Sequence, residues 1–323
     1  RVVYYLSKSN TKVTVYLFTG SLEKKLKMDE ALKARQPTKE LRLKRKILGK
    51  DGGRVEQVKW GKDNQLLTLT SGASSLTSLL VWDAPSGIRT HLVIPMYSWL
   101  LASAIEQKEG QFVACGGLEN ICCVYKLESG SESIETASAE LKQHDGYISD
   151  IKFVHGKERI LTSSGDSECI LWDVEKQMST TVHSGHDADV TGIALNPAEP
   201  DVFISGGVDN TVKAWDMRVG KTVATYDCGH EVNHVSYFPD GNAFCAALGN
   251  SECKIFDDRA GGLYKTFKSP TGNSECKMAQ FSNSGRLLFA CYDDETCFAF
   301  DVAVDDGPAQ RLDSDKVRAK CLD

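Results

Sequence analysis

Short apolar runs alternate with polar turns along most of this chain. Between Gln143 and Asp216 one pattern occurs twice: an alternating apolar run, a turn, a strand of small residues, a second turn and a strand that ends in Trp-Asp. The two closing tryptophans, Trp172 and Trp215, lie 43 residues apart. Alternation with a period of two predicts strands. The repeat therefore predicts an all-β protein built from four-stranded units.

Strand endings of the same kind recur along the chain. A period of about 43 residues with four strands per repeat is typical of a WD-repeat β-propeller. A seventh ending at this period would fall beyond Asp323. We therefore predict a seven-bladed propeller over residues 43–323, with six complete blades and an incomplete seventh. The sequence is then either a fragment or that of a divergent protein. The six endings close at Asp83, Tyr125, Asp173, Asp216, Asp257 and Asp301.

Two repeats carry a matching set of polar residues. A His lies in the turn before the first strand, an Asp follows 22 or 23 residues later, and a Trp closes the repeat. With a strand Ser or Thr, such residues form hydrogen-bonded chains that satisfy buried polar groups. Because the spacing recurs with the fold, we interpret the set as structural and not catalytic. Its members are His144, Asp166, Trp172, His186, Asp209 and Trp215.

The N-terminal part does not follow the repeat. Residues 1–20 read as a β-rich segment of two runs around a polar turn, which could be a hairpin, a segment foreign to the fold, or the source of the missing strands. Residues 21–36 predict a short helix that Ser21 can cap and Pro37 ends. The helix and the basic linker after it make up residues 21–42.

Charge is unevenly distributed. The chain has a net charge of −6, yet residues 22–50 contain eleven Lys and Arg against four Asp and Glu. An acidic body argues against nucleic acid as a partner. We interpret the basic segment Lys39–Lys46 as a solvated helix or edge strand; contact with anionic lipid or nucleic acid is the alternative. No apolar run approaches the length of a membrane span.

The eleven cysteines show no C-x-x-C pair and no zinc-type spacing. Four of them lie three residues before a strand-closing aromatic, where other repeats have Leu or Val: Cys122, Cys169, Cys253 and Cys297. At such positions cysteine acts as a small apolar core residue. We therefore expect buried free thiols, which suit a reducing compartment, and neither metal nor cofactor.

Several longer strings resemble the heterotrimeric G-protein β subunit family. They include CGGLENIC (115–122), FPDGNAF (238–244) and FSNSGRLLFACYDDETC (281–297), in the same order and spacing as in that family. The resemblance covers roughly residues 43–322. These strings are far more specific than a Trp-Asp ending.

The resemblance implies a non-catalytic signal transducer. Such a protein binds the GDP form of Gα on one propeller face, binds Gγ through its N-terminal helix and blade sides, and relays receptor signals to effectors. It would be cytoplasmic, held at the inner face of the plasma membrane by lipidated partners. The positions that match Gα contacts are Arg54, Trp99, Leu118, Tyr147, Asp189, Glu231 and Asn233, and those in the Gγ-binding helix are Leu22 and Leu26.

The chain departs from the family pattern at several of these places. Arg54 stands for Lys and Glu231 for Asp, which keeps each charge but changes the geometry. Glu56 stands for Tyr, Thr191 for Met and Gly249 for Asp. Trp99 matches after a shift of one residue, and the Trp of the last blade has no counterpart. The strength of Gα binding depends on these differences.

Two other function classes stay open at this point. A generic WD-repeat scaffold or adaptor would share the fold but not the Gα-binding face. A propeller enzyme would need a catalytic constellation, yet the chain has no G-x-x-x-x-G-K-[ST] and no G-x-S-x-G motif. Binding that depends on the nucleotide state of Gα would separate the transducer from the scaffold.

Overall fold

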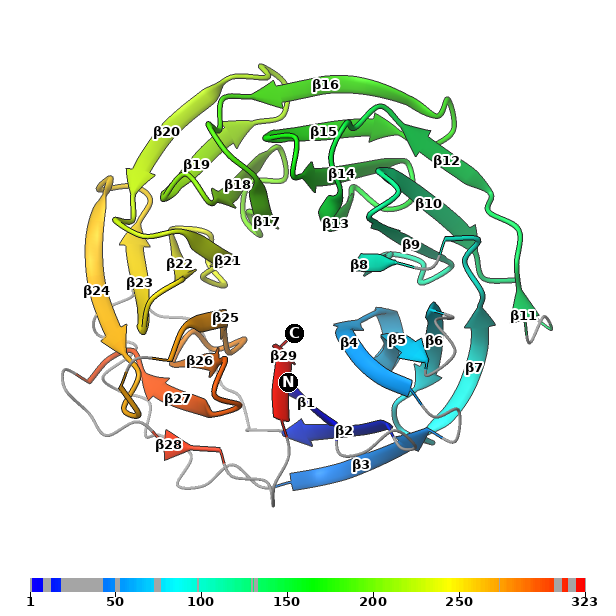
Figure 1. The fold of residues 1–323 in the computed structure, drawn as a ribbon, viewed down its shortest axis with the longest axis horizontal. Helices are drawn as coiled ribbons and strands as arrows, with labels where there is room; N and C mark the ends of the chain where they lie inside the picture. The colour runs from blue at the N-terminus through cyan, green and yellow to red at the C-terminus, as the bar shows by residue number, and fades with distance from the viewer. Residues whose placement is uncertain are drawn as a thin grey trace.

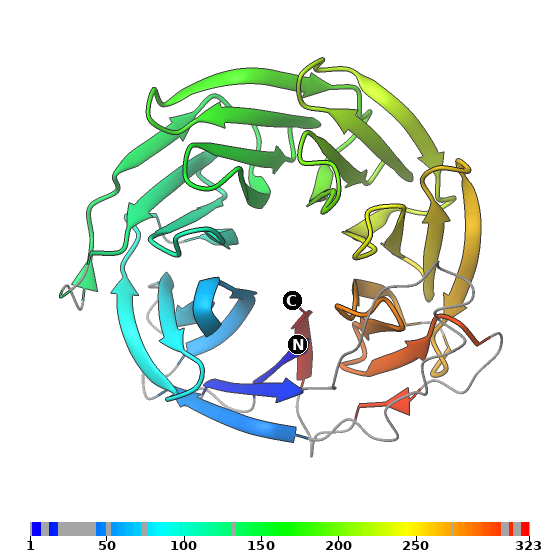
Figure 2. The ribbon, with the colours of Figure 1, turned by 180° about the vertical axis from the view of Figure 1, so that it is seen from behind.

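The computed structural model describes residues 2–7, 13–18, 43–49, 53–72, 77–97, 99–128, 130, 133–272, 274–304, 310–312 and 318–322. Their strands form a ring of sheets around a central axis, with each sheet running from near the axis to the rim (Figure 1, and from behind in Figure 2). The all-β propeller prediction is confirmed. The predicted helix with Leu22 and Leu26 lies outside the described residues.

Six of the sheets follow one another along the chain, and in each the first strand lies innermost. The first holds β4 (Gly53–Trp60), β5 (Gln65–Gly72), β6 (Thr77–Asp83) and β7 (Ile88–Val93), with β11 (Ser133–Ile134) parallel to β7. A 3₁₀ turn, η1 (Lys62–Asn64), joins β4 to β5. The second holds β8 (Leu100–Ile105), β9 (Phe112–Gly117), β10 (Ile121–Lys126) and β12 (Ala139–Lys142).

The next four sheets repeat the same antiparallel order. Their strands are β13 (Ile148–Val154), β14 (Arg159–Ser164), β15 (Glu168–Asp173) and β16 (Met178–Ser184); β17 (Val190–Leu195), β18 (Val202–Gly207), β19 (Thr211–Asp216) and β20 (Thr222–Asp227); β21 (Val232–Tyr237), β22 (Ala243–Leu248), β23 (Glu252–Asp257) and β24 (Gly262–Lys268); β25 (Cys276–Phe281), β26 (Leu287–Tyr292), β27 (Cys297–Asp301) and β28 (Gln310–Arg311).

Both ends of the chain enter one further sheet, which completes the seven formed by the described strands. Its order is β29 (Arg318–Leu322), β1 (Val2–Ser7), β2 (Val13–Phe18) and β3 (Leu43–Gly49). Strand β1 pairs with β29 and with β2, and β2 pairs with β3, all antiparallel. Residues 2–18 thus supply the two middle strands. The pairing of β1 with β29 joins the two ends of the described chain within one sheet, which lies between the sheets of β4 and β25 (Figure 1).

The strands of small residues are explained by how closely neighbouring sheets approach. A Cβ built on Gly206 in β18 would lie 2.5 Å from Val232 Cγ1 at the start of the next inner strand, and one on Gly116 would lie 3.0 Å from Ile148. Only glycine leaves room for that approach. The spaces between sheets are filled by large apolar side chains. Trp215, for example, is fully buried and stacks on Phe203 with ring centroids 6.1 Å apart.

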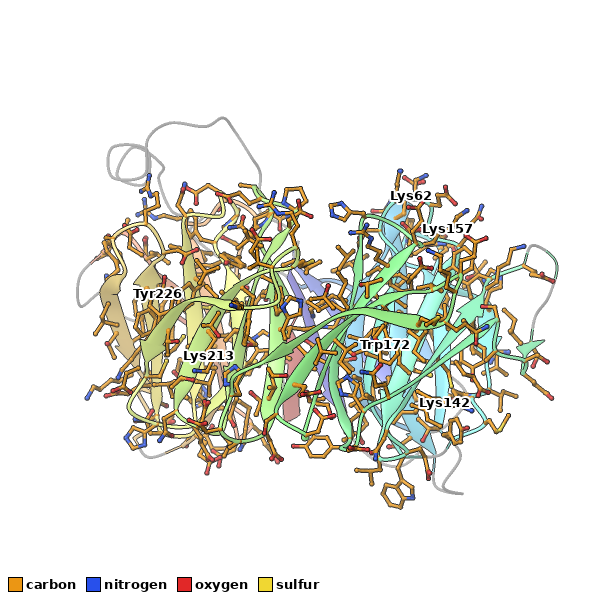
Figure 3. The ribbon with its side chains drawn as sticks, turned by 90° about the horizontal axis from the view of Figure 1, so that it is seen from above. Lys62, Lys142, Lys157, Trp172, Lys213 and Tyr226 are labelled. Carbon is orange, nitrogen blue, oxygen red and sulfur yellow. A yellow bond between two sulfur atoms is a disulfide. The ribbon has the colours of Figure 1, made fainter. Side chains whose placement is uncertain are left out.

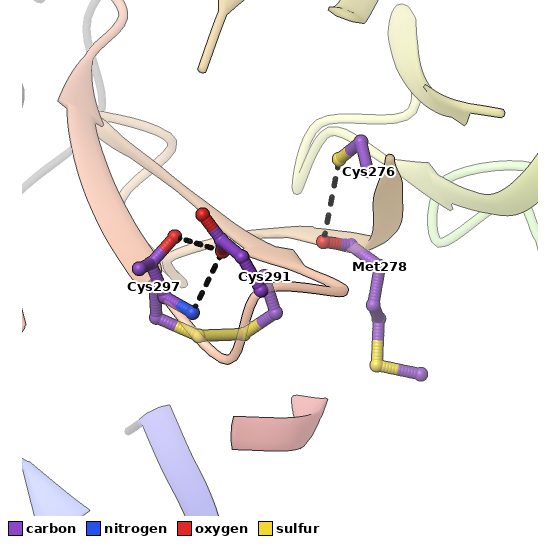
Figure 4. The surroundings of a disulfide bond; sticks show 6 residues. Cys276, Met278, Cys291 and Cys297 are labelled. Atoms are coloured by element: carbon purple, nitrogen blue, oxygen red, sulfur yellow. Dashed lines mark hydrogen bonds between the residues drawn. A yellow bond between two sulfur atoms is a disulfide. The ribbon is translucent and has the colours of Figure 1, made fainter. Parts of the chain in front are cut away.

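One expectation about the cysteines is wrong. Cys291 and Cys297 form a disulfide, whereas eight other cysteines are free and buried. The two residues lie directly opposite each other in the register of β26 and β27, with Cα atoms 4.3 Å apart (Figure 4). The spacing rules for linear motifs do not detect a pair that strand register creates across a hairpin.

Candidate partner-binding face

Four equivalent backbone hydrogen bonds mark one end of the ring, here called the leading face, where the inner strands begin. At each, an N–H of the turn between the second and third strands donates to the carbonyl just before the inner strand. The pairs are Leu118 to Trp99, Gly165 to Tyr147, Val208 to Asp189, and Gly249 to Glu231, with N–O distances of 2.8–3.0 Å. Five of the seven predicted Gα-contact residues thus take part in these equivalent bonds: Trp99, Leu118, Tyr147, Asp189 and Glu231.

The opposite end, the trailing face, is where the inner strands finish. Lys142 immediately precedes the turn into β13, whereas Lys62 and Lys157 follow β4 and β13. Viewed from the side, Lys142 lies on one face of the ring and the other two lie on the opposite face (Figure 3).

Each inner strand from β4 to β25 has a β-bulge near its start. The bulge lies at the second residue of β8, β13, β17, β21 and β25, and at the fourth residue of β4. In each case one residue has no partner in the register of the neighbouring strand. Bulges redirect side chains and are common next to functional sites. The six bulged positions are Glu56, Leu101, Ser149, Thr191, Asn233 and Lys277. Two of them bond the next sheet: Thr191 Oγ1 donates to Val232 O (2.5 Å) and Asn233 Nδ2 to Cys276 O (3.0 Å).

Tyr147 and Asp189 are joined across two sheets. The Tyr147 hydroxyl donates to Asp189 Oδ2 at 2.9 Å. Partial burial and this carboxylate raise the pKa of Tyr147 to about 12, so the phenol keeps its proton. The ring lies over Gly165, where a Cβ would overlap the ring carbons. The contact holds the half-buried aromatic ring and the carboxylate in one arrangement.

The sheet adjacent to that of Tyr147 has exposed apolar side chains at its leading end. Trp99 is 64%, Leu118 51% and Leu101 44% exposed. Leu101 is a bulged residue, and its neighbours Leu100 and Ala102 are buried. An exposed aromatic with apolar neighbours and a polar surround is the composition of a protein interface centre. Sequence reasoning missed Leu101; its signal was the second Leu of the string SWLL.

The other expected contact residues occupy the same face with different surroundings. Glu231 is exposed, and its side chain fills the space that a Cβ at Gly249 would need. Asn233 is half-buried and bonded as above. Glu56 accepts a hydrogen bond from Ser71 Oγ at 2.9 Å. Arg54 lies in β4, but its side chain is outside the described part of the structure.

Two hydrogen-bonded chains run inward from the leading face. Trp172 Nε1 donates to Thr162 Oγ1 (2.8 Å), Thr162 contacts His144 Nε2 (2.8 Å), and His144 Nδ1 contacts Asp166 Oδ2 (2.6 Å). The neighbouring sheet has the same arrangement. Trp215 Nε1 donates to Ser205 Oγ (2.8 Å), Ser205 Oγ contacts His186 Nε2 (2.7 Å), and His186 Nδ1 contacts Asp209 Oδ2 (2.8 Å). With a proton on Nδ1 of each His, every donor in the chain has an acceptor.

These chains have the electrostatics of structural groups. Burial opposes the charge of Asp166, but hydrogen bonds from His144 and backbone N–H groups lower its pKa overall. Burial lowers the pKa of His186 despite the nearby Asp209. The His186 imidazole is therefore neutral, and both His144 and His186 are buried with a hydrogen-bond partner at each ring nitrogen. Among the described residues, no cluster of three or more His, Cys, Asp or Glu is placed to hold a metal ion.

In the part of the chain that the structure describes, no helix is both long and apolar enough to cross a membrane.

Comparison with known proteins places the chain in a family. The family model described as G protein beta WD-40 repeat protein matches residues 32–323. A guanine nucleotide-binding protein subunit beta from Solanum tuberosum is 34% identical over 270 residues, which span 79% of this chain and 70% of that protein. The protein of the same name from Arabidopsis thaliana is 35% identical over 289 residues (84% and 75%), and that from Zea mays 36% over 265 (77% and 68%). The chain belongs to the G protein β WD-40 repeat family.

Proposed function

We propose that this protein is a non-catalytic transducer of the G-protein β type and that its leading face binds a G-protein α subunit in the GDP form. The observation that supports this most directly is the apolar group Trp99, Leu101 and Leu118 on the sheet adjacent to that of Tyr147, together with the Tyr147–Asp189 pair. The relatives that share the family are named as β subunits of guanine nucleotide-binding proteins.

The geometry suits a binding module. Aromatic anchors that are already fixed lose little side-chain entropy when a partner docks. Tyr147 is held by Asp189 and packs over Gly165, so its position is set before binding. The inner bulges at Thr191 and Asn233 bond one sheet to the next, which keeps the parts of the face in register. Burial of Trp99 at the centre of an interface would contribute about 2 kcal/mol or more.

The test is a pull-down with an α subunit loaded either with GDP or with a non-hydrolysable GTP analogue. We expect binding in the GDP state and loss of most binding in the activated state. Trp99→Ala and Asp189→Asn should each weaken the GDP complex. Val223→Ala is the matched control, because Val223 is 70% exposed on the outer strand β20 and away from the leading face. Equal binding in both nucleotide states, or none, would favour the scaffold function.

We also propose the remaining partners and the finer architecture. Residues 21–42 would form the helix and linker that bind Gγ through Leu22 and Leu26, and the dimer would relay signals to effectors at the inner face of the plasma membrane through lipidated partners. The seven sheets would be the seven blades of one propeller over residues 43–323, with residues 2–18 inserted in the closing blade. Co-purification of a γ subunit with the full chain but not with a Leu22→Asp, Leu26→Asp variant tests the first point.

A further inference from the structure

The turn between β26 and β27 is strongly acidic. It holds three consecutive carboxylates, Asp293, Asp294 and Glu295, and all three residues are exposed. The N–H of Asp293 donates to Glu275 O at 3.0 Å, which is a fifth bond of the kind that marks the leading face. The acidic turn is therefore part of the surface that we propose for a partner.

The backbone of this turn suits its sequence poorly. Glu295 has a φ of 68°, in the left-handed region. The equivalent residues of three other turns are Asn120, Ser167 and Asn210, with φ of 60°, 71° and 66°, and Asn tolerates this region better than Glu does. Three neighbouring negative charges also repel one another. Such an arrangement persists where the surrounding structure holds it in place.

Hydrogen bonds hold part of the turn. The N–H of Tyr292 donates to Thr296 O (2.9 Å), and that of Glu295 donates to Tyr292 O (3.1 Å). Asp294 accepts from the Thr296 N–H at 3.0 Å and from the Thr271 hydroxyl at 2.8 Å. Hydrogen bonds at an exposed turn open at a low cost in free energy.

The disulfide closes the base of the turn. Cys291 and Cys297 directly flank residues 292–296 and are 1% and 2% exposed (Figure 4). A cysteine or valine recurs at the place of Cys297 in four other sheets, but the residue opposite it is small and carries no thiol. These cross-strand pairs are Cys122 with Gly116, Cys169 with Ser163, Val212 with Gly206, and Cys253 with Ala247. Cys291 is thus a departure from the repeat, at the sheet with the acidic turn.

The bond is unlike the other cysteines of the chain. Eight further described cysteines are free and buried. In a protein whose thiols are otherwise reduced, a disulfide is usually transient and senses the redox state. The two cysteines are six positions apart in sequence. A bond that closes so short a loop constrains the turn directly and the rest of the chain little.

We propose that Cys291 and Cys297 form a reversible redox site that controls the acidic turn on the leading face. In the oxidised form the disulfide holds residues 293–295 in one arrangement. A dithiol reductant breaks the Sγ–Sγ bond: it delivers two electrons and two protons, leaves two thiols on the protein and itself becomes a disulfide. A partner must then order the turn when it binds, which lowers its affinity. This last step rests on the proposed function, whereas the redox site itself does not.

Hydrogen exchange of the full chain, measured by mass spectrometry with and without dithiothreitol, tests the site without any partner. Iodoacetamide should label both cysteines of the reduced, folded protein. We expect exchange at residues 292–296 to become about tenfold faster or more on reduction. Exchange at residues 164–168, the equivalent turn of another sheet, should not change.

Two variants accompany this measurement. The double variant Cys291→Ala, Cys297→Ala should exchange quickly at residues 292–296 whether or not dithiothreitol is present. Cys122→Ala is the matched control, because Cys122 holds the place of Cys297 in its sheet but faces Gly116. It should keep the response of the unaltered chain. If the double variant does not fold, the oxidised and reduced forms of the unaltered chain decide the question.

Unchanged exchange at residues 292–296 after reduction would overturn the proposal. So would a disulfide that is reduced only when the whole chain unfolds, or faster exchange throughout the ring, since the bond would then be a general crosslink of the fold.

The pull-down with GDP-loaded α subunit tests the partner step. The double variant, used without reductant so that the thiols of the α subunit stay untouched, should bind about fivefold more weakly than the oxidised chain. Equal binding would refute the partner step. Absence of binding by both proteins would count against the proposed function, and the exchange data would still decide the redox site.

Discussion

The hydroxyl of Thr162 is the link that connects Trp172 to His144, and its removal measures what the inward hydrogen-bonded chain contributes. Thr162→Val keeps the shape of the side chain but removes the oxygen. It would leave two buried polar groups without partners, the Trp172 indole N–H and His144 Nε2, which now lie 2.8 Å from that oxygen. At about 1–3 kcal/mol for each orphaned group, we expect a loss of about 2–6 kcal/mol in the free energy of unfolding.

The chain offers a matched control in the first sheet. Thr68 is fully buried like Thr162 and accepts from Trp82 Nε1 at 3.0 Å, but no His contact accompanies it. Thr68→Val orphans one group and should therefore cost about 1–3 kcal/mol. Thr180→Val, on an exposed position of β16 where the hydroxyl donates to Leu171 O, should change stability by about 0.5 kcal/mol or less.

Urea denaturation followed in parallel by tryptophan fluorescence and far-UV circular dichroism gives the three values. The urea concentration at the unfolding midpoint should be highest for Thr180→Val, lower for Thr68→Val and lowest for Thr162→Val. The slope of the free energy of unfolding against urea concentration should be unchanged. An equal cost at Thr68 and Thr162 would refute the reasoning, because it would mean that the bond to His144 contributes nothing.

Three further predictions follow from other parts of the ring. His183 is fully buried, and burial lowers its pKa to about 4. Since the same side chain in the unfolded chain takes up a proton near pH 6.5, the free energy of unfolding should fall by about 3 kcal/mol between pH 6.5 and 4. Part of that loss should vanish in His183→Leu when unfolding is followed across this range, and an unchanged pH dependence in the variant would contradict the prediction. Gly165→Ala would displace the Tyr147 ring and should weaken α-subunit binding in the pull-down more than Gly262→Ala, at a glycine with open space around it and no left-handed backbone. Equal effects would argue against a fixed Tyr147. Deletion of residues 1–18 removes both middle strands of the closing sheet and should lower the melting temperature and promote association; an unchanged melting curve of the monomer would contradict that pairing.

The repeating part of the fold was readable from the chain because it depends on local order. Each strand pairs with the next one along the sequence, so alternation and the period of the Trp-Asp endings predict the sheets from β13 to β24 closely. The spacing from His144 to Asp166 likewise reflects one strand and one turn, and the two side chains meet at 2.6 Å. Such contacts span about 20 residues of regular structure, which leaves few alternatives.

Contacts between neighbouring sheets could not be predicted from this local order. Tyr147 and Asp189 are predicted singly from the family resemblance, but their hydrogen bond depends on the angle between two neighbouring sheets. The bulge that exposes Leu101 depends on one unpaired residue in β8. The Cys291–Cys297 pair depends on the register of a hairpin. A slip of one residue turns a side chain to the other face, and sequence pattern alone does not exclude it.

The sequence by itself determined an all-β ring of repeated sheets, the inward chains of His144 and His186, and the family. Only the tertiary structure decided how the ring closes, because β1 and β29 are separated by the whole length of the chain and pair only once the other sheets have brought them together. It also decided which side chains share a face. Trp99, Tyr147 and Asp189 precede the inner strands of three different sheets, and only the packing of inner strands around one axis places them on one face.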